Sequence, residues 1–192
     1  MKLIRKILFL DEHVCPWWCG YALDNPLRRL IHSPEKMLRP YLREGMTAAD
    51  IGCGMGHFSL GMAKLVGEEG RVISADLQQK MLDRLRKHAE RAGLADRISL
   101  QLCEQDTIGI TEAVDFVLTF WMAHEVPSAK PFFQQIHSIL KPNGKWLLAE
   151  PKLHISNSRF GKTLATAQEV GFRVTARPRI RISYAAVLEK GD

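Results

Sequence analysis

The stretch Thr47-Ala-Ala-Asp50-Ile-Gly52-Cys-Gly54-Met-Gly56-His57 decides the fold. A short apolar run ends in three glycines, and a segment with helical spacing of its apolar residues follows over residues 58–65. Glycines at such a turn let the backbone pass close to a ligand and bend sharply from a strand into a helix. The stretch therefore predicts the first strand–turn–helix unit of an α/β domain that binds a ligand at this turn.

The spacing of the glycines separates the possible ligands. A dinucleotide fingerprint, G-x-G-x-x-G, would place its third glycine at position 57, where His57 stands. The sequence has G-x-G-x-G instead, and Asp50 precedes the first glycine by two residues. A carboxylate there would repel a pyrophosphate and favour a cationic ligand. The turn also lacks the Gly-Lys-Ser or Gly-Lys-Thr of a P-loop, so this class is excluded.

An acidic residue follows the second predicted strand. Asp76 ends the segment Val72-Ile-Ser-Ala-Asp76, about 20 residues beyond the glycine turn, where a carboxylate accepts hydrogen bonds from the ribose hydroxyls of an adenosine. Together, the turn and Asp76 indicate a ligand that contains adenosine.

The rest of the chain alternates strand-like and helix-like segments, which is typical of βαβ units around a parallel sheet with helices on both faces. We expect strands over 47–51, 71–75, 98–102, 114–118, 146–149, 172–176 and 182–188, and helices over 58–65, 81–92, 132–140 and 160–170.

The chain divides at about residue 45 into a short N-terminal arm and helix (1–45) and the α/β domain (46–192). Ser33 and Pro34 predict the start of a helix over 34–42. An arm of this size cannot form its own core, so we expect it to pack across the domain and cover the site. Its aromatic residues either pack it onto the sheet edge or form a wall of a substrate pocket; these are Trp17, Trp18 and Tyr21.

Composition excludes several classes of protein. Of 192 residues, 46% are hydrophobic and 25% charged, as in soluble globular domains. The net charge of +6 permits anionic partners, but no stretch interleaves basic residues with aromatic ones, so a nucleic-acid partner is not expected.

The apolar run 7–10 is too short for a signal peptide or a membrane span. No metal site is expected, because the residues His13, Cys15 and Cys19 lack a second pair at zinc spacing. The four cysteines follow no disulfide framework, so we expect a cytoplasmic protein. We also expect it to be a monomer or a homodimer.

Four segments together resemble the class I S-adenosylmethionine-dependent methyltransferases, in particular the small ubiquinone/menaquinone-biosynthesis group. They are Asp50–Gly56, Asp76, Asp115-Phe-Val-Leu, and Leu140-Lys-Pro-Asn-Gly-Lys-Trp-Leu-Leu-Ala-Glu150, and the resemblance runs from about Thr47 to the C-terminus. It implies a Rossmann-like, mostly parallel sheet of seven strands whose last strand is antiparallel. It also implies S-adenosylmethionine as the cofactor.

The resemblance implies which residues hold this cofactor. Gly52 and Gly54 would line its methionine portion, and Asp76 would hold its ribose. Glu104 or Asp106 would take the position on the adenine side, although Cys103-Glu-Gln-Asp106 departs from the family's usual Gly-Asp-Ala. The full set of expected cofactor-binding residues is Asp50, Gly52, Cys53, Gly54, Gly56, Asp76, Leu77, Glu104, Gln105, Asp106 and Phe120.

Methyl transfer to a hydroxyl, thiol or carbon acid needs a base as well as positioning of the acceptor. His124 and Glu125 follow the fourth strand, at the edge where open α/β sheets bind ligands. His124 could take a proton and Glu125 could orient it; alternatively, His124 caps a helix or bonds a backbone carbonyl. Glu150 and His154 flank the end of the fifth strand and are further catalytic candidates. We expect a small-molecule acceptor. The alternatives are an RNA methyltransferase and a non-catalytic domain that binds the cofactor and regulates a partner.

Overall fold

A computed structural model describes residues 31–191, and a sheet of seven strands forms its centre. The strand order is β3-β2-β1-β4-β5-β7-β6, and β7 runs antiparallel to both β5 and β6 while the other neighbours are parallel. The α/β class, the seven strands and the antiparallel last strand are therefore confirmed. The strands are β1 (Thr47–Ile51), β2 (Arg71–Asp76), β3 (Ile98–Leu102), β4 (Val114–Phe120), β5 (Leu140–Pro151), β6 (Phe172–Ala176) and β7 (Ser183–Lys190).

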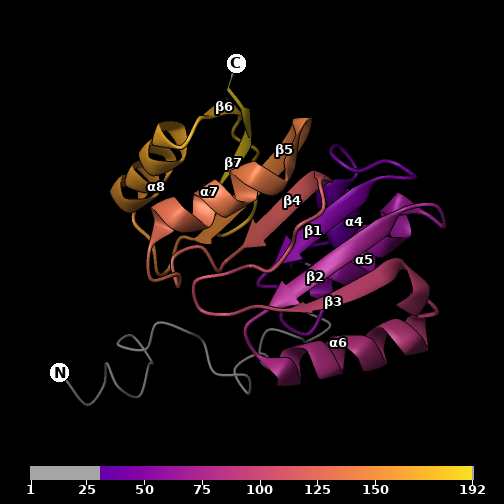
Figure 1. The fold of residues 1–192 in the computed structure, drawn as a ribbon. Helices are drawn as coiled ribbons and strands as arrows, with labels where there is room; N and C mark the ends of the chain where they lie inside the picture. The colour runs from indigo at the N-terminus through magenta and orange to yellow at the C-terminus, as the bar shows by residue number, and fades with distance from the viewer. Residues whose placement is uncertain (1–30, 192) are drawn as a thin grey trace, which may run out of the picture.

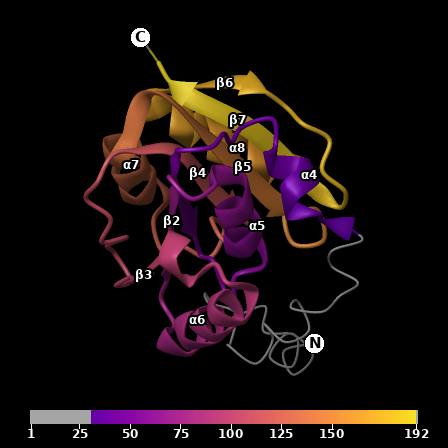
Figure 2. The same ribbon diagram turned by 90° about the vertical axis from the view of Figure 1, so that its right-hand side faces the viewer.

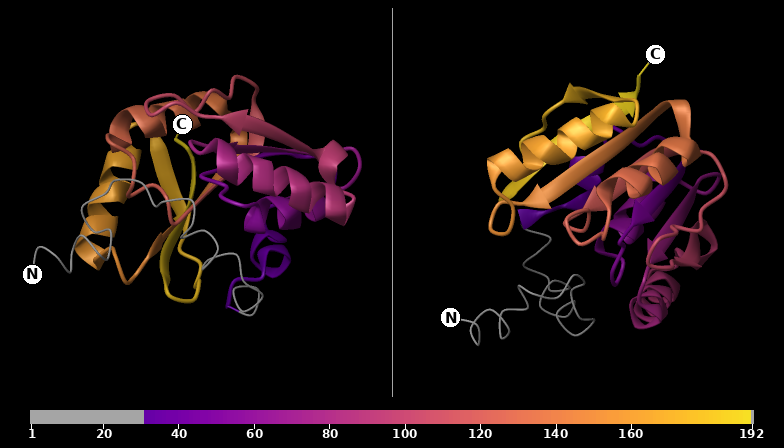
Figure 3. Two further views of the ribbon diagram at one scale, coloured as in Figure 1. Left: turned by 90° about the horizontal axis from the view of Figure 1, so that it is seen from below. Right: turned by 60° about the vertical axis from the view of Figure 1, so that its left-hand side comes forward.

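Helices cover both faces of the sheet (Figures 1 and 2). On one face α7 and α8 lie side by side, and their apolar residues pack with Trp146 and Leu148 of β5 (Figure 3). On the other face α4 and α5 pack on β1, β4 and β5, and α6 contacts β2 and β3. The helices are α4 (Pro34–Leu38), α5 (His57–Val66), α6 (Gln79–Ala92), α7 (Ala129–Ile139) and α8 (Asn157–Glu169), with a 3-10 turn at Ala95–Arg97.

Strand β5 begins earlier than the sequence predicted. It starts at Leu140 rather than at residue 146, directly where α7 ends. Val114 of β4 pairs with Leu140, but Phe116 pairs with Lys145, so residues 141–144 form a bulge in β5. The proline and glycine of this segment end the helix, as expected, but the chain accommodates them within an irregular strand.

Helix α4 is shorter than the predicted 34–42, because it ends at Leu38. Pro40 has no N–H for the helical hydrogen bond and disfavours a helical conformation of the residue before it. Ser33 stands at the N-cap, but its side chain makes no capping hydrogen bond.

The described part of the N-terminal arm packs on the domain. A Cβ on Gly61 of α5 would lie 2.4 Å from Cβ of Pro34, so α4 lies directly against α5. The rest of the arm, including His13, Cys15, Trp17, Trp18, Cys19 and Tyr21, lies outside the described residues, and its role as a cover stays a prediction. No helix within residues 31–191 combines the length and the apolar character needed to cross a bilayer.

The sheet order places a topological switch point at β1. The chain proceeds from β1 outward to β2 and β3, and then returns to β4 on the other side of β1. Open α/β sheets bind ligands outside the carboxyl ends of their strands at such a point. The arrowheads of β2 and β4 mark this carboxyl edge in Figure 1.

Candidate active site

The glycine turn connects β1 to α5 at the carboxyl edge. Gly52, Gly54 and Gly56 have φ of 73°, 54° and 92°, a left-handed conformation that favours glycine. A Cβ on Gly52 would lie 2.6 Å from Cγ of Met122, and one on Gly56 would lie 2.1 Å from Cδ1 of Leu85. A Cβ on Gly54 would meet nothing within 4 Å. The turn is thus packed at its two ends and open at its middle, where a ligand can approach the backbone.

Asp76 faces this turn from the end of β2. Its Oδ2 accepts a hydrogen bond of 2.9 Å from the Gly54 N–H, and its Oδ1 accepts one of 2.9 Å from the Gln78 N–H. Burial raises the pKa of the Asp76 carboxyl, and the backbone N–H groups of Gln78, Gly54 and Leu77 oppose that rise. The carboxylate is 9% exposed and keeps lone pairs beyond those used by the backbone. Its free lone pairs are available to accept hydrogen bonds from a ribose, and this role stays a prediction.

Asp50 and Cys53 turn their side chains into the protein. Asp50 is 2% exposed, and its Oδ2 accepts a hydrogen bond of 2.6 Å from the Ser59 hydroxyl. Cys53 packs against Leu82 and Leu85 of α6, and burial, with the charges of Asp76 and Asp50, raises the pKa of its thiol well above the usual value. The Cys53 side chain is therefore a neutral packing group, and a contact with a cofactor would come from its backbone.

The residues expected on the adenine side also lie at this edge. The Cys103 N–H donates to the carbonyl of Asp76, and Glu104 and Thr107 exchange two backbone hydrogen bonds. The side chains of Glu104, Gln105 and Asp106 are exposed on this turn after β3. Leu77 is exposed beside Asp76, whereas Phe120 is buried at the end of β4. The fold brings these candidates to one edge, and the choice between Glu104 and Asp106 stays open.

His124 and Glu150 form a hydrogen-bonded pair. The Nδ1 atom of His124 lies 2.5 Å from Oε2 of Glu150, which is 1% exposed at the end of β5. Because a carboxylate accepts, Nδ1 carries a proton, and a ring with a single proton then has its lone pair at Nε2. Within residues 31–191, Oε1 of Glu150 has no hydrogen-bond partner. A buried carboxylate with one oxygen free beside an imidazole is typical of a functional site.

The two other catalytic candidates lie beside this pair. The ring of His154 packs edge-on to that of His124, with centroids 6.1 Å apart. Glu125 was expected to orient His124, but the carboxylate that binds Nδ1 belongs to Glu150. Glu125 is the neighbour of His124 in the chain. Glu150 is its neighbour in space, because β4 and β5 are adjacent parallel strands whose ends lie together.

Two residues that the sequence reasoning missed complete this edge. Trp121, directly after β4, has φ of 61°, which is strained for a bulky side chain, and its Nε1–H donates to the Ser183 hydroxyl at 2.8 Å. His32 is buried against Phe120 and Trp121, its Nε2–H donates to the Arg181 carbonyl, and its own carbonyl accepts from Nε2 of His57. Trp121 lies three residues after the predicted strand 114–118, and this position was a signal that could have identified it. No sequence pattern marked His32.

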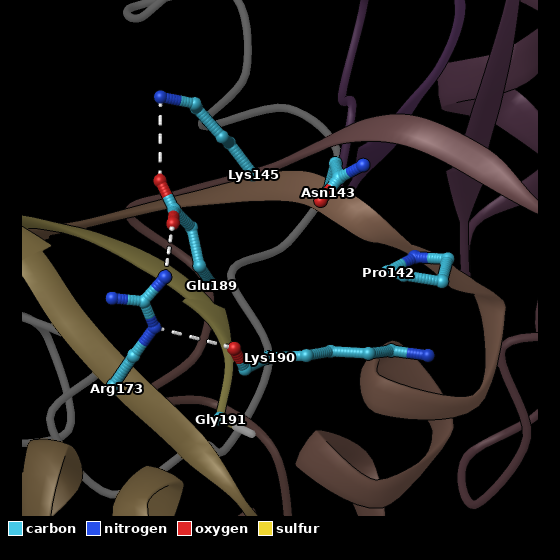
Figure 4. A pocket seen from close by; sticks show the side chains of 7 residues that line it. All are labelled: Pro142, Asn143, Lys145, Arg173, Glu189, Lys190 and Gly191. Carbon is cyan, nitrogen blue, oxygen red and sulfur yellow. Dashed lines mark hydrogen bonds and ion pairs between the residues drawn. The ribbon is translucent and has the colours of Figure 1, made fainter.

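A separate polar depression of about 520 Å³ lies near the opposite end of β5 (Figure 4). Glu189 lies between Lys145 and Arg173 there, at 3.3 and 3.1 Å, so its charge is already matched. Since Glu150 lies near the carboxyl end of the same strand, this depression is remote from the candidate site.

Comparison with known proteins agrees with this arrangement. A family model described as "Methyltransferase domain" matches residues 42–175. A demethylmenaquinone methyltransferase of Lactobacillus johnsonii is 33% identical over 105 residues, which cover 54% of this chain and 43% of that protein. A carboxy-S-adenosyl-L-methionine synthase of Hydrogenovibrio crunogenus is 27% identical over 146 residues, covering 74% of this chain and 57% of that protein.

The fold has a close counterpart among solved structures. A SAM-dependent methyltransferase from Aquifex aeolicus superposes with a TM-score of 0.83 at 22% identity, covering 91% of this chain and 98% of that one. The chain spans about half the length of the curated relatives that it matches.

Proposed function

Since this chain belongs to the family of methyltransferase domains, we propose that it transfers a methyl group from S-adenosylmethionine to a small, partly apolar acceptor. The observation that carries the proposal is the meeting of two sets of residues at one edge of the sheet. The glycine turn with Asp76 lies on one side of the switch point, and the His124–Glu150 pair lies on the other.

The residues of the glycine turn and Asp76 fit S-adenosylmethionine. The open middle of the turn at Gly54 and the free lone pairs of Asp76 suit the methionine portion and the ribose. Leu77 and the turn 104–106 would flank the adenine. Asp50 and Phe120 are both buried, so their proposed part is to support this site from inside the protein. When bound, the cofactor supplies a methyl group on a sulfonium, which makes it an electrophile.

His124 is the proposed base. Glu150 fixes the Nδ1–H tautomer, so Nε2 can take a proton from a hydroxyl, thiol or carbon acid as that atom becomes the nucleophile. The carboxylate of Glu150 then stabilises the imidazolium. His154 stands where it can contact the acceptor or orient it. These roles are part of the proposal, as are a cytoplasmic location and a monomeric or homodimeric state.

A small acceptor is supported by the relatives. The names of the Lactobacillus johnsonii and Hydrogenovibrio crunogenus proteins refer to a demethylated quinone and to a derivative of the cofactor itself, and both are small molecules. The test is incubation of the full chain with methyl-labelled S-adenosylmethionine and with fractionated cell extract. Label in a nuclease- and protease-resistant small molecule is the expected result. Label in RNA, or tight cofactor binding without transfer to any fraction, would instead support one of the two alternatives.

A further inference from the structure

Three exposed aliphatic side chains stand on neighbouring segments beside the candidate site. Leu153 is 86% exposed, Ile182 45% and Ile31 41%. The Lys152 N–H donates to the Ile182 carbonyl at 2.9 Å, and Nε2 of His32 bonds the Arg181 carbonyl at 2.9 Å. These bonds place the three segments side by side at the carboxyl edge, where the start of α4 lies next to the loop before β7 (Figure 2).

Exposed cationic side chains accompany these aliphatic ones. We call the whole group the basic–apolar patch; it consists of Ile31, Lys152, Leu153, Arg179, Arg181 and Ile182. Residues 151–188 hold seven Lys and Arg and one Glu, a net charge of +6, while the remainder of the chain balances to zero. The positive charge of the protein is thus concentrated in the part of the chain that carries most of this patch.

Ile182 has an unfavourable backbone conformation in its exposed position. Its φ is 52°, a left-handed conformation that is a genuine outlier for a β-branched residue. The Lys152 N–H fixes the Ile182 carbonyl, and the Ser183 N–H donates to the Ile180 carbonyl at 3.2 Å. Strain of this kind persists only where the surrounding structure enforces it, and it gathers at functional positions.

We infer that the basic–apolar patch docks on the surface of an anionic lipid bilayer. Lys152, Arg179 and Arg181 face anionic headgroups, and Leu153, Ile182 and Ile31 enter the boundary between headgroups and acyl chains. Nucleic acid would use the cations but not the aliphatic side chains, and the patch has no exposed aromatic residue for stacking on bases. The combination of aliphatic tips and cations therefore favours lipid.

Docking in this way turns the carboxyl edge toward the bilayer. His154, which follows Leu153 and packs on His124, would lie near the lipid surface. This consequence rests on the proposed function: an apolar acceptor dissolved in the bilayer could then reach the site without crossing water.

Cosedimentation of the full chain with vesicles tests the inference independently of any methyl transfer. Vesicles of phosphatidylcholine alone are compared with vesicles that contain about one third phosphatidylglycerol, at about 0.1 M salt, where the Debye length is about 10 Å. We expect binding to the anionic vesicles and loss of this binding at high salt. Arg179→Glu/Arg181→Glu should weaken it by more than about tenfold, because each cation near the surface contributes about 1 kcal/mol.

Uncharged and remote variants separate the two contributions. Leu153→Ser, which leaves the charge unchanged, should also weaken vesicle binding, and Leu153→Phe should strengthen it. Arg86→Glu/Lys87→Glu on α6 is the matched charge control, because it changes the net charge by the same amount, and it should change binding much less than the double variant in the patch. Melting of each variant checks the fold; Leu153 is so exposed that its replacement should not lower the melting temperature.

Three results would overturn the inference. The first is absence of binding of the intact chain to anionic vesicles. The second is vesicle binding that the patch variants leave unchanged, which would place the contact elsewhere in the chain. The third is a combination that would identify a nucleic-acid surface. In it, the chain binds transfer RNA in a salt-sensitive way, Arg179→Glu/Arg181→Glu abolishes this binding, and Leu153→Ser changes neither RNA binding nor vesicle binding.

Discussion

Nδ1 of His124 and Oε2 of Glu150 lie 2.5 Å apart, although 26 residues separate them in the chain. The contact exists because β4 and β5 are parallel neighbours whose carboxyl ends meet at one edge. It directs the lone pair of the imidazole to Nε2 and places a buried negative charge behind the ring. A histidine held in this way is prepared to accept a proton.

Glu150→Gln should lower the transfer rate while it leaves the site intact. The amide can still accept from Nδ1–H, but it no longer stabilises the imidazolium that forms when Nε2 takes a proton. We expect kcat to fall by roughly 10²-fold, within the range for loss of acid–base assistance, with little change in KM for the acceptor. Steady-state kinetics with both parameters resolved make the measurement.

Glu125→Gln is the comparison that separates the two carboxylates near His124. Since Nδ1 bonds Glu150, the change at Glu125 should affect kcat less than the change at Glu150. An equal or larger effect at Glu125 would restore the original expectation that Glu125 orients the ring.

Asp76→Ala should weaken binding of S-adenosylmethionine by at least tenfold. Hydrogen bonds to a charged group contribute about 1.5–3 kcal/mol each, and the carboxylate is proposed to accept from two ribose hydroxyls. Calorimetry on the folded variant measures the affinity. Unchanged affinity would reject the assignment, and tight binding of NADH to the unaltered chain would point to a dinucleotide site instead.

The affinity for the cofactor should depend on pH through Asp76. An exposed aspartate has a pKa of about 3.9. Burial raises the pKa of the Asp76 carboxyl above that value, so this group takes up a proton at a higher pH. Because the proposed acceptor is the ionised form, binding should weaken as the pH falls through the raised pKa.

The stability of the ligand-free protein should follow the opposite course for this one group. A raised pKa in the folded state contributes stability below the unfolded pKa, and this contribution is lost as the pH rises through the folded pKa. Asp76→Asn should remove both dependences. An acid-induced loss of affinity that persists in Asp76→Asn would assign it to another group.

Gly54→Ala and Gly93→Ala form a matched pair. Both glycines have positive φ, 54° and 65°, and a Cβ at either position meets nothing within 4 Å. Each change should therefore cost about 1–2 kcal/mol of stability from the left-handed backbone. Only Gly54→Ala fills the open middle of the turn, so it alone should weaken cofactor binding, by tenfold or more; equal affinity in both variants would contradict the placement of the ligand.

Gly56→Ala and Gly161→Ala should change stability in opposite directions. Gly56 has φ of 92°, and a Cβ there would collide with the Leu85 side chain, so its replacement should lower the melting temperature. Gly161 lies inside α8 without neighbours for a Cβ, and alanine should stabilise that helix by about 0.5–1 kcal/mol. Thermal unfolding of both variants makes the comparison, and a stabilised Gly56→Ala would show that the turn tolerates a side chain.

The elements around Asp76 could be predicted from the sequence because they are local. The run 47–51, the glycines after it and the acid at the end of β2 follow one another along the chain, and the positive φ at Gly52, Gly54 and Gly56 is the conformation that glycine favours. Helix α6 likewise ends at Gly93, which has φ of 65°, as its pattern predicted.

The candidate catalytic side could be predicted only in part, because it depends on contacts between distant segments. The positions of His124, Glu150 and His154 after predicted strands made them candidates, but the pairing of His124 with Glu150 requires the order of β4 and β5. The position of His32 depends on its contacts with Arg181 in the loop before β7 and with His57 of α5, for which the sequence has no periodic signal.

The single-turnover rate of methyl transfer in His124→Gln shows whether His124 is the base of the reaction. The measurement follows formation of labelled product from the preformed complex with S-adenosylmethionine, alongside the affinity of the same variant for the cofactor. We expect a rate lower by about 10²–10⁴-fold, with the cofactor affinity changed by less than about threefold. A rate within about threefold of the unaltered chain would contradict it, and would show that His124 does not take the proton.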